Sequence, residues 1–113
     1  MEIKETLENQ CVIVSVKGRI DSYTAPRFSE TLLAITDRGI YRIILDLREV
    51  VYISSAGLRV LIDIHKNCQN TNKGELALVC VPERVHDTLE MVGFTSLFRL
   101  FPNVQVALQQ VQS

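Results

Sequence analysis

The feature that most constrains the fold of this chain is a β-branched apolar segment followed closely by the start of a helix. Residues 41–47, with the sequence YRIILDL, predict a buried strand. From Leu58 onward, apolar side chains recur at helical spacing. The loop between them ends in Ser54-Ser55-Ala56-Gly57, and serine is a preferred N-cap residue. The sequence therefore places a serine hydroxyl at a helix N-terminus, where unpaired N–H groups and the helix dipole favour an anion such as phosphate.

The rest of the chain alternates between short strand-like and helix-like segments. The order β-β-α-β-α-β-α-β-α predicts an α/β fold with a mostly parallel or mixed sheet. A chain of 113 residues without internal repeats is expected to form one domain over 1–113. Strands are expected over about residues 2–7, 11–16, 41–47, 75–81 and 98–101; Gly18 is expected to end the second strand, and a turn is expected at Asn9-Gln10. Helices are expected from Thr24 to Gly39, from Ser55 to about Asn70, from Pro82 to Gly93 and from Pro102-Asn103 onward.

Composition and charge exclude several classes of function. The formal net charge is −1, which gives no electrostatic basis for direct binding of nucleic acid. Apolar segments are too short to span a membrane and the N-terminus does not resemble a signal peptide, so we expect a cytoplasmic protein without membrane insertion. The three cysteines form no C-x-x-C pair, which argues against a disulfide framework or a zinc site.

A catalytic role is not expected for the serine motif. Ile53 lies two residues before Ser55, so the G-x-S-x-G pattern of hydrolases is absent. His65 lies about 15 Å further along the same helix, which is too far to take a proton from Ser55. His86 starts another helix, and both histidines are expected at the surface or its boundary. Along its helix, His65 is expected on the side that faces the sheet, with Leu58, Leu61 and Ile62. No nucleotide-binding or metalloprotease motif occurs, and no cofactor or metal is expected.

Four segments of the chain carry motifs of a known family in the correct order. They are Val16–Asp21 with Thr24–Pro26, Leu45–Leu47 with Tyr52–Leu58, Lys73–Leu76, and Met91–Phe94 with Leu97-Phe98. Together these segments resemble the STAS family, the anti-sigma factor antagonists of bacteria; each similarity is weak alone, and the combination is specific. The segment around the two serines resembles the family's L-D-L strand followed by an aromatic or apolar pair and D-S-[ST/A]-G-L.

The resemblance implies a role for each residue of the site. Aligned on Gly57, Ser55 matches the serine that the family phosphorylates, and Ser54 replaces an acidic residue and is the alternative phosphate acceptor. Asp21 is placed on the partner-facing surface, although its carboxylate can also accept N–H bonds in an Asx-turn. Arg59 is either a partner contact or a solvated charge paired with Asp63 at i, i+4. The residues expected to bind a partner are Asp21, Ser22, Tyr23, Thr24, Ser54, Ser55, Ala56, Gly57 and Arg59.

The resemblance also implies a fold and a function. The fold is a mixed sheet of about four to five strands with about four helices packed mainly on one face. The unmodified protein would bind an anti-sigma factor that is also a serine kinase of the histidine-kinase-like ATPase type, and so release a sigma factor. Phosphorylation of Ser55 would block this binding, and a PP2C-type phosphatase would reverse it. The alternative is a constitutive docking subunit of another bacterial assembly, such as a lipid-transport ATPase, without a phosphorylation switch.

Overall fold

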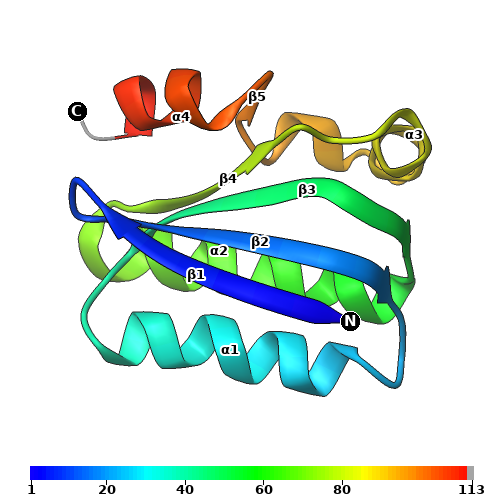
Figure 1. Ribbon diagram of the computed structural model, residues 1–113, viewed down its shortest axis with the longest axis horizontal. Coiled ribbons are helices and arrows are strands. Elements are labelled where there is room, and N and C mark those ends of the chain that lie inside the picture. Colours follow the sequence, from blue (N-terminus) through cyan, green and yellow to red (C-terminus); the bar gives the residue numbers. More distant parts are fainter. Residues whose placement is uncertain (112–113) are drawn as a thin grey trace.

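The computed structural model describes residues 1–111, and of Asn72 only the backbone. Figure 1 shows an α/β arrangement in which one sheet separates helices on its two sides. Its elements follow the expected order, with one added 3₁₀ helix. They are β1 (Glu2–Glu8), β2 (Cys11–Ile20), α1 (Ala25–Asp37), β3 (Arg42–Ile53), α2 (Ser55–Asn72), β4 (Glu75–Val79), α3 (Glu83–Met91), η1 (Phe94–Ser96), β5 (Leu100–Phe101) and α4 (Val104–Val111).

The sheet is mixed, as predicted, with the strand order β1-β2-β3-β4-β5. β1 and β2 form an antiparallel hairpin, and every later pair of neighbouring strands is parallel. The hairpin turns at Asn9 and Gln10, whose φ angles are 51° and 67°. Two successive left-handed residues match the twist of the flanking strands, which explains the tight turn.

β2 and β3 extend beyond their predicted ends. β2 continues through Gly18 to Ile20, because Gly18 adopts φ 106° and a register shift follows it. β3 continues to Ile53, well past the expected end at Leu47. The charged pair Arg48-Glu49 interrupts the apolar pattern but stays exposed, while Val50 and Ile53 return to the core. This shared extension pairs Ile20 with Ile53 at the ends of the two strands.

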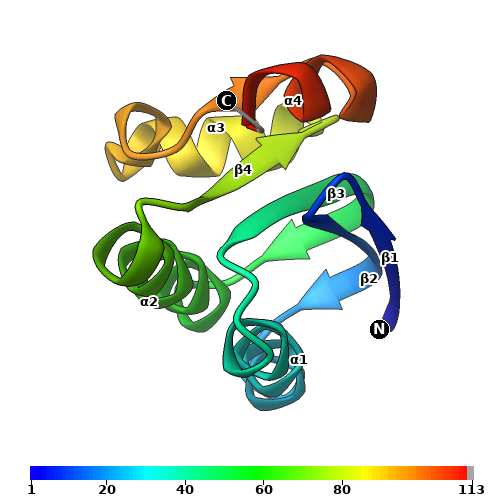
Figure 2. The same ribbon diagram turned by 90° about the vertical axis from the view of Figure 1, so that its left-hand side faces the viewer.

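The two faces of the sheet are covered unequally (Figure 2). Three of the four helices, α1, α2 and α3, contribute to the larger core, as predicted, with one face of β2, β3 and β4. α4 covers the opposite face, where Ala107, Leu108 and Val111 pack against apolar residues of β2, β3 and β4. Burial of these apolar side chains supplies the main driving force for folding. Within residues 1–111, no helix is both long enough and apolar enough to cross a membrane.

The start of α1 and the end of β4 differ from the prediction. Thr24 occupies the N-cap position of α1 but makes no side-chain capping bond to the helix. Its hydroxyl accepts a bond from the Asp21 amide at 2.8 Å and donates to the Arg19 carbonyl at 3.0 Å. β4 ends at Val79 rather than Val81, because Cys80 takes a left-handed φ of 53°. The Cys80 thiol donates to the Pro102 carbonyl, which joins this bend to the segment before α4.

His65 faces the sheet, as expected from its position along the helix, but it is buried and does not lie at the surface or its boundary. It is 6% exposed and packs against Phe98, with 4.9 Å between ring centroids. Its Nδ1 atom accepts a hydrogen bond from the Leu76 amide at 3.1 Å, so the ring joins α2 to β4. Burial lowers the pKa of His65, against smaller opposing effects of Glu75 and the Leu97 backbone. His65 therefore supports the core and lies apart from the serine motif.

Candidate functional site

The candidate functional site lies where the parallel strands β2 and β3 end at the same edge of the sheet. Ile20 and Ile53 are paired there, and the Ser54 amide donates to the Ile20 carbonyl at 2.8 Å. This bond places the loop that starts at Asp21 beside the loop that starts α2. The carboxyl ends of parallel strands are the usual position of binding sites in α/β sheets. The two segments singled out from the sequence are therefore neighbours in space.

Asp21 organises its loop from within. Its Oδ1 atom accepts hydrogen bonds from the amides of Tyr23 at 3.0 Å and Thr24 at 3.1 Å, which forms the predicted Asx-turn. The Thr24 backbone bond is the main cause of the lowered pKa of Asp21, and the Tyr23 amide and Arg19 act in the same direction. Thr24 is half-buried, whereas Ser22 is exposed and the Tyr23 side chain is 92% exposed. The turn thus presents Ser22 and Tyr23 outward.

The two serines have different roles. Ser54 is the N-cap of α2, and its Oγ atom accepts a hydrogen bond from the Gly57 amide at 3.3 Å. Ser55 is the first residue of α2, and its side chain is exposed. Within residues 1–111, no hydrogen bond is formed by the Ser55 hydroxyl. Because Ser54 caps the helix, the Ser55 hydroxyl remains available to another molecule.

Gly57 is buried, and its small size serves the protein's own packing. A Cβ atom at this position would lie 2.7 Å from Cγ2 of Ile20 and 2.8 Å from Cγ1 of Ile53. Such distances are far below van der Waals contact, so any side chain would push α2 away from the two strand ends. Ile20 and Ile53 fill the space that a side chain at position 57 would need, and the expectation that Gly57 contacts a partner stays a prediction. Ala56 is half-buried and also packs against the larger core.

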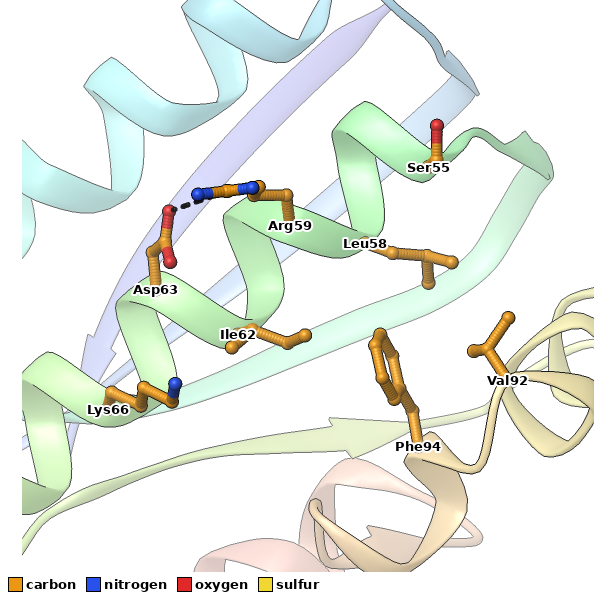
Figure 3. Close-up of a pocket in the computed structure, with 8 residues that line it drawn as sticks. All are labelled: Ser55, Leu58, Arg59, Ile62, Asp63, Lys66, Val92 and Phe94. Atoms are coloured by element: carbon orange, nitrogen blue, oxygen red, sulfur yellow. Dashed lines mark ion pairs between the residues drawn. The ribbon is translucent and has the colours of Figure 1, made fainter.

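An open groove of about 380 Å³ begins at Ser55 and follows α2 (Figure 3). Leu58 and Ile62 point from α2 toward Val92 and Phe94, which form the other wall after α3. The outer rim is charged, with Arg59 Nε 4.0 Å from Asp63 Oδ2. The lining residues are Ser55, Leu58, Arg59, Ile62, Asp63, Lys66, Val92 and Phe94.

Several of these residues were not singled out as site residues from the sequence. Val92 and Phe94 belong to the segment that resembles the STAS family, but nothing in their local pattern shows that they face α2. Arg19 and Tyr52 were also missed. The Arg19 guanidinium lies 4.5 Å from the centroid of the Tyr52 ring and 3.7 Å from Asp21, measured from Nε to Oδ2. Strand pairing could have suggested this contact, because Arg19 and Tyr52 are neighbours in the β2–β3 register.

Two relatives are named as anti-sigma factor antagonists. A candidate anti-sigma factor antagonist, BtrV of Bordetella bronchiseptica, is 37% identical over 87 residues, which are 77% of this chain and 74% of BtrV. The anti-sigma-B factor antagonist of Staphylococcus aureus is 28% identical over 106 residues, which are 94% of this chain and 97% of that protein.

Solved structures share the fold. A candidate anti-sigma factor antagonist from Thermotoga maritima superposes with a TM-score of 0.92 at 21% identity, covering 98% of this chain and 95% of that chain. The Bacillus cell fate determinant SpoIIAA in its phosphorylated form gives 0.73 at 12% identity, covering 97% and 99%. The sequence model of the STAS domain matches residues 2–107. The expected family is confirmed: this chain belongs to the STAS domain family.

Proposed function

We propose that this protein is an anti-sigma factor antagonist whose binding is switched off by phosphorylation of Ser55. The observation that carries the proposal is the division of roles between the two serines. Ser54 is half-buried, and its hydroxyl already accepts a hydrogen bond from the Gly57 amide, whereas Ser55 is exposed at the first position of α2. This arrangement favours Ser55 over Ser54 as the phosphate acceptor. The names of the relatives from Bordetella and Staphylococcus support the antagonist role.

The partner is proposed to be an anti-sigma factor that is also a serine kinase of the histidine-kinase-like ATPase type. In the transfer, the Ser55 oxygen forms a bond to the γ-phosphorus of ATP while the bond to ADP breaks, and a base on the kinase takes the hydroxyl proton. A PP2C-type phosphatase hydrolyses the phosphoserine and restores the free hydroxyl. The chain supplies the acceptor and not the catalysis, and we place it in the cytoplasm as a single domain over 1–113.

The proposed docking surface surrounds Ser55 on both loops. Tyr23 and Ser22 project from the first loop, and the Arg59 side chain, 82% exposed, projects from α2 one turn beyond Ser55. A flat aromatic ring and an arginine are the residue types most often found at the energetic centres of interfaces. Asp21 and Thr24 contribute by holding the loop in shape through their internal bonds.

Phosphate is compatible with the folded chain and incompatible with a close interface. It adds about −1.5 to −2 charges at pH 7. At the N-terminus of an 18-residue helix the dipole favours this charge, so the domain keeps its fold. In a packed interface the same group would clash and lose its hydration. A loss of about 3 kcal/mol weakens binding roughly a hundredfold.

The proposal is tested by intact-mass analysis of the protein purified from its own organism during growth and stress, with peptide mapping of residues 48–66. We expect one phosphate on Ser55, varying with condition, lost in Ser55→Ala and kept in the matched variant Ser54→Ala. Absence of phosphate under every condition would contradict the switch and favour the constitutive docking subunit. Phosphate on Ser54 would contradict the assignment of the acceptor.

A further inference from the structure

Three residues at four-residue spacing lie along the exposed side of α2. They are Ser55, Arg59 and Asp63, and each also borders the groove. Arg59 Nε lies 4.0 Å from Asp63 Oδ2, with the two side chains 82% and 65% exposed. Figure 3 shows Arg59 turned toward Asp63, away from the Ser55 hydroxyl, which points outward. Arg59 therefore has one anionic neighbour now and would have a second, in the opposite direction, once Ser55 carried phosphate.

The physics of helical ion pairs favours the second neighbour. An anion four residues before a cation is a better arrangement than the reverse, because each charge then agrees with the helix dipole. Arg59–Asp63 has the cation first, whereas phosphoserine 55 with Arg59 would have the anion first. Phosphate also carries about −1.5 to −2 charges and three acceptor oxygens, against −1 for a carboxylate. Arginine pairs with phosphate through two parallel N–H bonds.

The other cations near the groove are less suited to this role. The Arg19 guanidinium is held between the Tyr52 ring and Asp21. Lys66 is eleven residues after Ser55, which places it about 16 Å away along the helix axis. Arg59 is one turn away, and i, i+4 side chains are direct neighbours on a helix surface.

We propose that phosphorylation of Ser55 transfers Arg59 from Asp63 to the phosphate, so that one modification changes the charge pattern over two turns of α2. The proposal rests on the proposed function in taking Ser55 as the modified residue. After the transfer, the Arg59 guanidinium is no longer available to a partner, and the Asp63 carboxylate is left without its ion pair to Arg59. The altered stretch from Ser55 to Asp63 extends about 12 Å along the axis. A partner on α2 thus loses a cationic contact in addition to meeting the phosphate.

The test uses the full chain with phosphoserine incorporated at position 55 during translation, so that no kinase is required. A ³¹P NMR titration gives the second pKa of the phosphate, which is about 6 when unperturbed. A paired arginine favours the dianion, so Arg59→Gln should raise this pKa by about 0.3 units relative to unchanged Arg59. Asp63→Asn, which removes the competing carboxylate, should lower it. Lys66→Gln is the matched control and should leave it unchanged.

Two results would overturn the proposal. An unchanged pKa in Arg59→Gln, or a larger increase in Arg19→Gln, would show that Arg59 does not hold the phosphate. An unchanged pKa in Asp63→Asn would show that Asp63 does not compete for Arg59. Because these variants are exposed at the surface, loss of folding is not expected to obscure the titration. Absence of phosphate in cells would instead contradict the proposed function, so the two ideas fail in different experiments.

Discussion

Replacing Gly57 by alanine provides the sharpest test of how the site is built, because two physical effects predict opposite signs. Alanine is a better helix former than glycine by at most about 1 kcal/mol, so propensity alone predicts stabilisation. The new Cβ atom would lie 2.7 Å from Ile20 Cγ2 and 2.8 Å from Ile53 Cγ1. Both isoleucines are buried and β-branched, so their rotamers cannot readily change.

Overpacking of this kind costs about 1–3 kcal/mol. Subtracting the gain in propensity leaves a net loss of about 0–2 kcal/mol in the free energy of unfolding. For a domain of this size the loss corresponds to a fall in Tm of up to roughly 8 °C. Thermal unfolding followed by circular dichroism measures the shift, and urea unfolding measures the free energy. The control is Ala34→Gly at an exposed position of α1, which should lose about 1 kcal/mol through propensity alone. An increase in Tm for Gly57→Ala would refute the packing argument.

Two further predictions concern the cap and the buried histidine. Ser54→Ala should lower the free energy of unfolding by about 0.5–2 kcal/mol in urea titrations, because the Gly57 amide loses its hydrogen-bond acceptor. Ser54→Asp should retain the cap. Equal losses in the two variants would refute the capping role of Ser54. Burial lowers the pKa of His65, so the neutral ring contributes to the free energy of unfolding. This contribution should be fully present above the unfolded pKa of about 6.5, and it should be lost as the pH decreases from that value toward the folded pKa. Urea titrations between pH 7 and 5 should show this loss in the wild type and in His86→Gln but not in His65→Gln. If the loss persisted in His65→Gln, protonation of His65 would not be its cause.

Local patterns were sufficient to predict the order of elements and the serine pair at the start of α2. The apolar period identified the strand that became β3 and the helix that became α2, and the hydroxyl residues located the start of that helix. The tight turn at Asn9-Gln10 and the Asx-turn at Asp21 were also correct, because both depend on residues close in sequence. Such features are decided within a few residues and are therefore visible without the tertiary structure.

Features that depend on distant residues could not be predicted. The length of β3 is set by its pairing with β2, and the exposed charges at Arg48-Glu49 disguised that pairing. The helical period placed His65 on the side that faces the sheet, but its full burial depends on β4, which supplies the Leu76 amide as a hydrogen-bond donor. The groove requires Val92 and Phe94 to lie opposite α2, although they follow the end of that helix by about twenty residues. In each case the decisive contact comes from another element.

The replacement of the family's acidic residue by Ser54 changes the electrostatics of the site without removing the cap. Serine and aspartate both cap a helix, so the geometry around Ser55 does not require the carboxylate. An aspartate next to phosphoserine would repel it, whereas the neutral Ser54 does not. The nearest cation along α2, Arg59, can then act on the phosphate without an adjacent carboxylate opposing it. We therefore expect this chain to accommodate phosphate at Ser55 more readily than a version with Asp at position 54.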